Sequence, residues 1–337
     1  MIKYIGSKRL LLPLITEVIE GLCPAPATVL DLFSGTSRVG HALKARGYRV
    51  IANDHNAYAH TLATCYVQAD AQDVLEDAAR LVAEFNAIPG VPGYFTQTFC
   101  EESRFFQPKN GARIDAIREA IAAKCLEPEL EAVMLVSLME AADRVDSTTG
   151  LQMAYLKSWA PRAHNDLELR LPNILPRAAS GKGAATCLDA AQAASTQADI
   201  AYIDPPYNQH SYLGNYHIWE TLIRWDKPEH YGVACKRADV RSRPSLFNSR
   251  RNFAAAFRAV IEAVRAPVLI VSFNDEGYLP REEAEAILSA RGELRTIERD
   301  YKRYVGAQIG IYNPRGDKVG TVGKLRNREF LFVCDGR

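Results

Sequence analysis

The sequence lacks a long hydrophobic run, a Cys-x-x-Cys spacing and a signal-peptide core in its first residues. None of its 337 residues belongs to an uninterrupted apolar stretch of about 18, the length that a membrane-spanning helix needs. The start Met1-Ile2-Lys3-Tyr4 has no signal-peptide core, which predicts a cytoplasmic protein without a membrane anchor. The seven cysteines are scattered and never spaced as Cys-x-x-Cys, so we expect reduced thiols and neither a disulfide framework nor a metal site.

The chain also lacks the large positive charge that many nucleic-acid-binding proteins carry, because its formal net charge is only +1. The charge is unevenly distributed. From Asp70 to Asp146, 15 acidic residues stand against 7 basic ones. Lys236 to Arg251 holds 6 basic residues and 1 acidic residue, and Tyr301 to Arg328 holds 7 basic and 1 acidic. A chain that is neutral overall can therefore still present a basic face.

An α/β pattern is present near the start of the chain. The apolar strand Thr28–Leu32 leads into the small-residue turn Phe33-Ser34-Gly35-Thr36-Ser37 and then into a helix. Such a turn lets the backbone approach a bound nucleotide, although a plain tight turn is the alternative. A second strand, Tyr48–Asn53, ends at Asp54, 54 − 31 = 23 residues after Asp31. Nucleotide-binding folds place a ribose-binding acid at this separation, and the absence of a Walker lysine favours a nucleoside cofactor.

The most informative stretch is Ala201-Tyr202-Ile203-Asp204-Pro205-Pro206-Tyr207. The apolar run Ile200–Ile203 predicts a buried parallel strand, and the two prolines must end its hydrogen-bond ladder because they have no backbone N–H. Asp204 and Tyr207 therefore lie at the carboxyl end of a strand, where open α/β sheets bind their ligands. The alternative is a tight turn in which Tyr207 only fills space.

This arrangement suits methylation of an aromatic amine. The exocyclic amino group of a base is a poor nucleophile because its lone pair is delocalised into the ring. A carboxylate that accepts one N–H, together with a rigid carbonyl that accepts the other, can draw the nitrogen toward tetrahedral geometry. Asp204 is the predicted first acceptor, and the carbonyl of Pro205, held still by the fixed φ of Pro205 and Pro206, is the second. Tyr207 is predicted to stack on a base swung out of the duplex.

Asp204-Pro205-Pro206-Tyr207 resembles the DPPY motif of the amino-group DNA methyltransferases, and in particular that of the Dam-like D12 class, which methylates adenine N6. The N-terminal Lys3-Tyr4-Ile5-Gly6-Ser7-Lys8 looks like motif X of these enzymes, and Asp31–Gly35 looks like motif I. The resemblance implies S-adenosylmethionine as cofactor. The cofactor contacts that it implies are Tyr4, Gly6, Lys8, Asp31, Phe33, Ser34, Gly35, Asp54, Asp189 and Asp204.

The resemblance also implies individual roles. Lys8 suits the methionine carboxylate, and Gly6 lets the backbone approach it closely. Asp54 matches motif II, which holds the ribose, and Asp189 matches motif III, where an acid faces the adenine amine of the cofactor. A plain helix N-cap is the alternative for Asp189. Ser37 departs from the family, which often has glycine there, and this places the local backbone detail in doubt.

The middle of the chain differs in kind from its two ends. It is helix-rich, with Asp73–Phe85, Arg113–Lys124 and Glu129–Val145 as predicted helices and no strand alternation. We therefore predict a catalytic domain formed by residues 1–66 and 181–337, interrupted by a helical domain over 67–180. In the resembling enzymes the target-recognition domain occupies this position. Because the segment is acidic, a lid or packing subdomain is the alternative.

The basic segments are the predicted DNA-binding surface. Lys236–Arg251 has small polar residues between its arginines and no apolar period, which is typical of phosphate-binding loops; a solvated charged loop is the alternative. Tyr301–Tyr304 and Arg328–Val333 are predicted to form an antiparallel hairpin that closes the sheet. The predicted DNA contacts are Lys236, Arg237, Arg241, Arg243, Arg250, Arg251, Lys302 and Arg303.

The predicted fold class is α/β: a Rossmann-like S-adenosylmethionine-dependent methyltransferase sheet with an inserted helical target-recognition domain. The predicted function is site-specific methylation of adenine N6 in double-stranded DNA by a monomer or weak dimer, with a cognate restriction endonuclease as candidate genetic partner. One alternative keeps the fold and changes the acceptor to cytosine N4 or to a base in RNA. The cytosine-N4 enzymes more often carry serine at the position of Asp204. A catalytically idle nucleic-acid-binding protein is the alternative of another class, and the presence of Asp204, Tyr207 and Asp54 argues against it.

Overall fold

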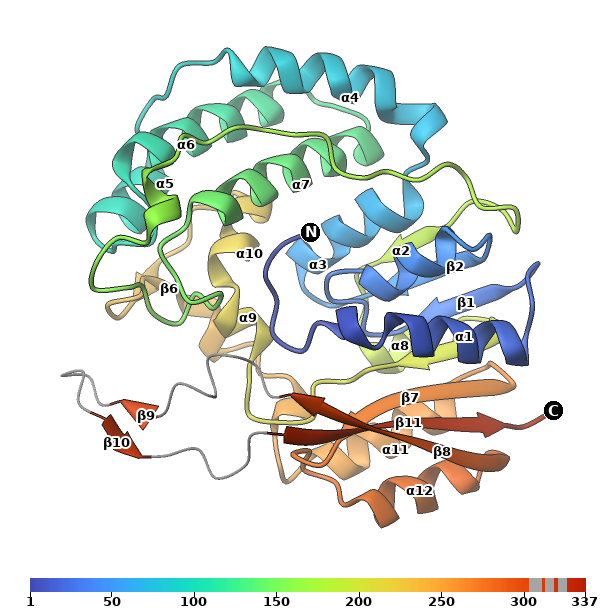
Figure 1. Ribbon diagram of the computed structural model, residues 1–337. Helices are drawn as coiled ribbons and strands as arrows, with labels where there is room; N and C mark the ends of the chain where they lie inside the picture. Colours follow the sequence, from blue (N-terminus) through green and yellow to red (C-terminus); the bar gives the residue numbers. More distant parts are fainter. Residues whose placement is uncertain (303–310, 313–317, 321–325) are drawn as a thin grey trace.

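The computed structural model describes residues 1–302, 311–312, 318–320 and 326–337 (Figure 1). Within these residues, seven strands form one sheet in the order β3-β2-β1-β4-β7-β11-β8. Neighbouring strands from β3 to β7 are parallel, and β11 runs antiparallel to both β7 and β8. The bounds are β1 Thr28–Asp31, β2 Arg49–Asn53, β3 Ala184–Thr186, β4 Ile200–Ile203, β7 Val268–Asn274, β8 Glu293–Lys302 and β11 Arg326–Asp335.

The central strands are short apolar runs because helices cover the sheet on both faces. All four residues of β4 and all seven of β7 are buried. From β1 the chain adds β2 and β3 on one side, and then returns to add β4 and β7 on the other. The switch point therefore lies between β1 and β4, and this is the crevice where such sheets bind ligands.

Two helical layers cover the sheet. On one face, α1 (Leu12–Leu22) and α2 (Arg38–Lys44) pack their apolar residues on β1, β2 and β4. On the other face, α8 (Ala190–Ala193), α11 (Phe253–Ala263) and α12 (Arg281–Ser289) pack on β4, β7 and β11. An antiparallel pair closes the sheet as predicted, formed by β8 and β11, which pair along their whole length. The first strand, β8, begins at Glu293, earlier than the predicted Tyr301–Tyr304, and residues 303 and 304 of that prediction lie outside the described residues.

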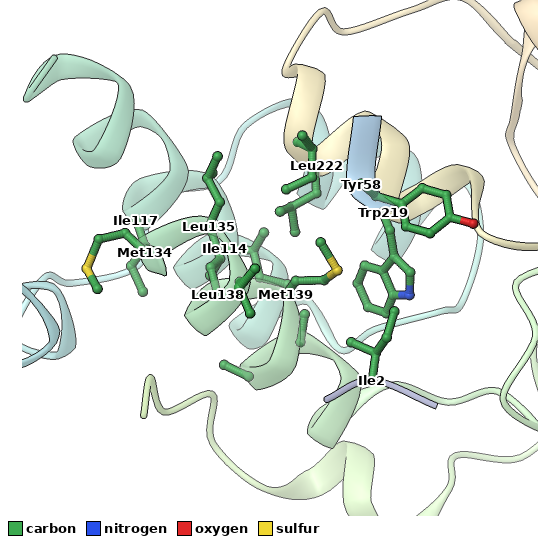
Figure 2. Close-up of a cluster of buried hydrophobic side chains, with 14 of the residues drawn as sticks. Ile2, Tyr58, Ile114, Ile117, Met134, Leu135, Leu138, Met139, Trp219 and Leu222 are labelled. Atoms are coloured by element: carbon green, nitrogen blue, oxygen red, sulfur yellow. The ribbon is translucent and has the colours of Figure 1, made fainter. Parts of the chain in front are cut away.

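A second body of helices lies beside the sheet, in the upper half of Figure 1. Its core holds large side chains such as Met139 and Trp219, shown in Figure 2 with Ile2 and Tyr58, and all four are at most 2% exposed. Its helices are α3 Ala57–Ala63, α4 Ala71–Asn86, α5 Tyr94–Thr96, α6 Pro108–Ala123, α7 Pro128–Val145, α9 Tyr212–Asn215 and α10 His217–Arg224. Since α9 and α10 follow β4 in the chain, segments from both ends of the sequence share this core.

Pro108–Gly111 is the first turn of α6, because proline at the first helical position needs no N–H partner. One local expectation was wrong. The predicted basic loop over Lys236–Arg251 begins with a strand, β6 (Lys236–Arg237), which pairs with β5 (His230–Tyr231). A further short pair joins β9 (Ile311–Tyr312) to β10 (Lys318–Gly320).

None of the helices in the described part of the chain combines the length and the apolar character needed to cross a bilayer.

Candidate active site

The main cavity lies at the switch point between β1 and β4 and encloses about 960 Å³, part of it open to solvent. Its wall contains most residues that the sequence predicted for the cofactor and the catalytic motif. Those residues are Tyr4, Gly6, Lys8, Asp31, Phe33, Ser34, Gly35, Asp54, Asp189, Asp204 and Pro206. Pro205 and Tyr207 are not part of the wall.

Asp204 follows directly after β4 and is paired with a lysine from the N-terminus. Its Oδ1 lies 3.1 Å from the Nζ of Lys8, and the same nitrogen lies 3.7 Å from Oε2 of Glu329 on β11. Burial raises the pKa of Asp204 to about 6, although Lys8 opposes this increase. Burial of Lys8 favours its neutral form, but Asp204 together with Tyr207, Glu329 and Tyr202 outweighs it and raises the pKa of Lys8 well above its usual value.

Asp31 is a buried acid with an unused acceptor. Its side chain ends β1 and is 1% exposed, and its Oδ2 has no hydrogen-bond partner among the described residues. Burial and the neighbouring charge of Asp204 raise the pKa of Asp31 to about 7. A buried carboxylate without a donor is costly, so this position is suited to a ligand that brings a cationic or N–H group.

The turn after β1 is held by Asp54. Oδ2 of Asp54 accepts the backbone N–H of Gly35 at 3.1 Å, and Oδ1 accepts the N–H of Asn56 at 3.0 Å. Ser37, where the resembling enzymes often have glycine, has φ 56° and ψ 24°. Only glycine adopts this left-handed conformation without a steric penalty, which explains the usual residue in physical terms.

Tyr4 belongs to a group of three tyrosine rings, of which Tyr4 and Tyr212 line the cavity. Its ring centroid lies 5.2 Å from that of Tyr212 and 4.6 Å from that of Tyr216. The centroids of Tyr212 and Tyr216 lie 6.5 Å apart, so the three rings form a triangle. The hydroxyl of Tyr4 lies 3.2 Å from that of Tyr58, and these contacts fix the position of Tyr4 in the cavity wall.

Tyr207 is placed in the protein core rather than in the cavity. It is 9% exposed, its ring packs against Phe273 with centroids 5.0 Å apart, and its hydroxyl accepts a hydrogen bond from Asn274 Nδ2 at 2.9 Å. In this conformation Tyr207 cannot stack on a base, so that predicted contact is not formed here.

Two interpretations were predicted for Asp189, a cofactor contact and a helix N-cap. It is the N-cap of α8, where Oδ1 accepts the N–H of Ala191 at 2.9 Å, and it also lines the cavity. A capping carboxylate keeps further acceptor capacity, so the cap does not remove Asp189 from the site.

Two charged residues at the site were missed by sequence reasoning. Arg38 lines the cavity at the start of α2, and its Nε is buried without a hydrogen-bond partner among the described residues. Glu329 reaches Lys8 from β11. The signal for Glu329 was an acid directly before the apolar run Phe330–Val333, whereas Arg38 had no comparable signal. Arg243, predicted as a DNA contact, also lines the cavity.

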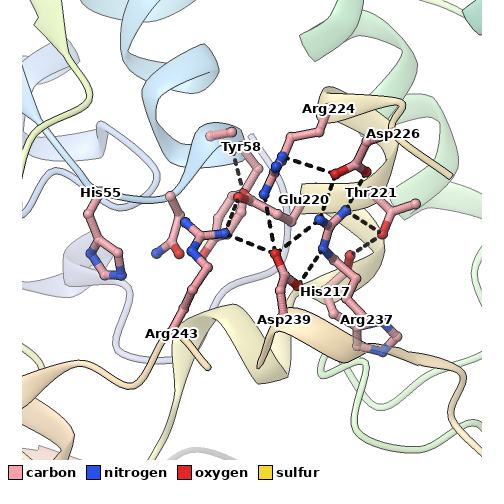
Figure 3. Close-up of polar contacts among 12 residues, drawn as sticks. His55, Tyr58, His217, Glu220, Thr221, Arg224, Asp226, Arg237, Asp239 and Arg243 are labelled. Carbon is pink, nitrogen blue, oxygen red and sulfur yellow. Dashed lines mark hydrogen bonds and ion pairs between the residues drawn. The ribbon is translucent and has the colours of Figure 1, made fainter. Parts of the chain in front are cut away.

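The predicted DNA-binding residues divide into two groups. Arg237 is 2% exposed, and its guanidinium contacts Asp226 at 2.7 and 2.8 Å and Asp239 at 3.0 and 3.1 Å (Figure 3). Arg237 is therefore a structural residue, and its assignment as a phosphate ligand was wrong, because the buried guanidinium donates to the half-buried carboxylates of Asp226 and Asp239. Arg243 is also paired, with Glu220 at 3.2 Å and Asp239 at 3.4 Å.

The remaining basic residues are more accessible. Arg241 is exposed and its guanidinium lies 3.7 Å from the centroid of the Tyr231 ring. Arg250 and Arg251 are exposed, shortly after Asn248 in the cavity wall, and Lys236 is half-buried. Lys302 ends β8, and Arg303 lies outside the described residues.

Comparison with known proteins agrees with this geometry. The family model of the D12 class N6 adenine-specific DNA methyltransferases matches residues 4–265. The chain belongs to this family. The match runs from the N-terminal motif through the acid after β4, so the D12 class resemblance of the short motifs is confirmed over most of the chain.

Individual relatives are type II methyltransferases. The chain is 33% identical to the type II methyltransferase M.FokI of Planomicrobium okeanokoites. The aligned region covers 90% of this chain and 49% of M.FokI. The chain is 29% identical to M.NlaIII of Neisseria lactamica over 89% of its length and 92% of that protein. It therefore spans about half of the first relative and nearly all of the second.

Proposed function

We propose that this D12 class protein transfers a methyl group from S-adenosylmethionine to adenine N6 at a specific sequence in double-stranded DNA. The observation that carries the proposal is the position of Asp204. An acid follows a buried strand, lies in the wall of the main cavity and is partly ionised near neutral pH. It thus provides an acceptor for an amino hydrogen beside a cavity large enough for a nucleoside cofactor.

The cavity fits S-adenosylmethionine by the chemistry of its donors and acceptors. Asp31 offers Oδ2, which has no partner among the described residues, to the cofactor's ammonium group, and Asp54 lies at the end of β2 for the ribose. Lys8, the sequence candidate for the methionine carboxylate, is paired with Asp204. Arg38 is the better candidate because its buried Nε has no partner among the described residues. When bound, the cofactor supplies a methyl group on a sulfonium.

The role of Asp204 requires that its carboxylate become available. In the structure Lys8 occupies Oδ1. We infer that an entering adenine amine replaces this contact, while Glu329, which also lies near Lys8, keeps the lysine charge compensated. Exchange of one charged hydrogen bond for another avoids leaving a buried ammonium unpaired.

Adenine is favoured over cytosine because the family description specifies N6 of adenine. The test is nucleoside mass spectrometry of DNA after incubation with the purified protein and S-adenosylmethionine. N6-methyladenine is the expected product. N4-methylcytosine in its place would overturn the acceptor, and absence of any methylated base under conditions where cofactor and DNA both bind would favour an idle binding protein.

The cofactor site is tested by substitutions on opposite sides of the cavity. Asp54→Ala and Arg38→Gln should each weaken S-adenosylmethionine binding by about 1.5–3 kcal/mol, since each removes a hydrogen bond to a charged group. Calorimetry measures the affinity directly. Arg9→Gln, an exposed arginine outside the wall of the main cavity, is the matched control and should change the affinity little. If Arg38→Gln binds S-adenosylmethionine as tightly as the parent does, Lys8 and not Arg38 would be the residue that binds the methionine carboxylate.

DNA binding is tested at the exposed arginines. Arg250→Gln combined with Arg251→Gln should flatten the dependence of log K on log salt by roughly one to two units, because each phosphate contact releases counterions. The charge-matched control is Arg258→Gln with Arg265→Gln, which are exposed on α11 and before the amino end of β7. If the slope of log K against log salt is the same for both double variants, Arg250 and Arg251 do not contact DNA phosphates.

The names of the relatives also support a biological setting. Since M.FokI and M.NlaIII are called type II methyltransferases, we infer a restriction-modification role with a cognate endonuclease as genetic partner. The helical body remains our candidate for target recognition. A monomer or weak dimer in the cytoplasm remains our expectation.

A further inference from the structure

A group of metal-binding side chains lies outside the main cavity. Glu102, His230 and Cys235 place one ligand atom each within 4.8 Å of the others, and this is the only such group of three found in the described part of the chain. Nε2 of His230 lies 2.7 Å from Oε2 of Glu102. The spacing of these residues in the sequence follows no metal-binding motif, which is why the sequence predicted no metal site.

The three side chains come from two separate parts of the fold. Glu102 follows the π-helical turn Gln97–Glu101, and Gln97 donates to its Oε1 at 3.2 Å, which leaves Oε2 directed to His230. His230 begins β5, and Cys235 lies in the turn between β5 and β6. Cys235 is 4% exposed, whereas the Glu102 side chain is 41% exposed. A metal here would be reached from solvent on the carboxylate side.

We propose that Glu102, His230 and Cys235 bind a zinc ion, with water as the fourth ligand. Sulfur, imidazole nitrogen and carboxylate oxygen together match the ligand preference of zinc and do not suit magnesium or calcium. Tetrahedral zinc requires ligand atoms about 3.3–3.8 Å apart, as its metal–ligand distances imply. The spacings in the structure, which reach up to 4.8 Å, would shorten when the ion binds.

The ion would join the helical body to the segment that carries the arginines. β5 pairs with β6, and Tyr231 on β5 contacts Arg241. One hydrogen bond already joins these two parts, because the hydroxyl of Tyr94 donates to the carbonyl of Pro228 at 2.8 Å. Zinc would add a second link two residues further along, at His230, and would hold the β5–β6 hairpin, after which the exposed arginines follow in the chain.

The experiment uses the untagged full chain, treated with a chelator and then titrated with Zn²⁺ or Co²⁺. We expect about one equivalent of Zn²⁺ to bind, and the Co²⁺ form to show a thiolate-to-metal charge-transfer band. Cys235→Ser should abolish that band, and His230→Gln should weaken Zn²⁺ binding by about 10–100-fold or more, at least the effect seen when residues that support metal ligands are changed. Zn²⁺ should also raise the unfolding midpoint of the parent but not that of the variants.

Cys125→Ser is the matched control, because that thiol is exposed at the end of α6 and far in sequence from the group. It should keep the stoichiometry, the affinity and the band. Because Cys235 has a positive φ of 47° and its substitution could disturb the turn, Glu102→Gln at an exposed position provides a second variant, expected to weaken Zn²⁺ binding. Failure of the parent to bind Zn²⁺, a Co²⁺ spectrum without the thiolate band, or unchanged binding in His230→Gln and Glu102→Gln would overturn the proposal.

Discussion

Asp204→Ala should reduce the methylation rate by about 10²-fold or more while leaving DNA affinity largely intact. The reason is that the carboxylate acts on the amine as it becomes tetrahedral, and loss of a preorganised electrostatic partner has this magnitude. Single-turnover methylation with saturating DNA and cofactor measures the effect. Lys8 keeps Glu329 as a neighbour at 3.7 Å in this variant, which favours retention of the fold.

The control and the pH profile separate a catalytic effect from a structural one. Asp77→Ala, an exposed acid on α4, makes the same charge change and should keep the parental rate. Because burial raises the pKa of Asp204 to about 6, the parental rate should fall about tenfold per pH unit below that value, as the protonated acid loses its acceptor. A rate that is independent of pH between 5 and 8, or an Asp204→Ala enzyme as fast as the parent, would contradict the role.

Arg237→Ala should lower the free energy of unfolding by about 3 kcal/mol, the lower end of the range for breaking a buried ion pair. The substitution removes the guanidinium that binds both Asp226 and Asp239. Arg224, which lies 3.2 Å from each of these carboxylates, stays in place. These carboxylates are 31% and 28% exposed, so water compensates part of the loss. Urea unfolding measures the change.

The matched variant is Arg241→Ala, which removes an exposed arginine four residues away. Its contact with the Tyr231 ring has the energy of an exposed cation–π pair, so we expect a loss of about 0.5–1 kcal/mol. If Arg237→Ala is as stable as the parent and its DNA binding depends less steeply on salt, Arg237 is a phosphate ligand, as the sequence predicted. If Arg237→Ala is less stable and the salt dependence is unchanged, the structural role is confirmed.

Predictions from sequence succeeded where the cause is local. The apolar run Ile200–Ile203 followed by two prolines can only be a strand that ends, and the structure places β4 over those residues. The strand predicted over Thr28–Leu32 is likewise present, as β1 over Thr28–Asp31. Since parallel strands end at one edge of a sheet, placing Asp31, Asp54 and Asp204 at strand ends was enough to bring them into one cavity.

What the sequence alone determined about this protein is thus its fold class, its family motifs and the edge of the sheet at which they meet. The tertiary structure decided how each charge is used. Lys8 faces Asp204 and Glu329, 196 and 321 residues away as 204 − 8 and 329 − 8, and Arg237 faces two acids rather than solvent. Strand and turn signals act over a few residues, whereas the pairing of a buried charge depends on which distant segments the packed core brings within a few ångströms of it.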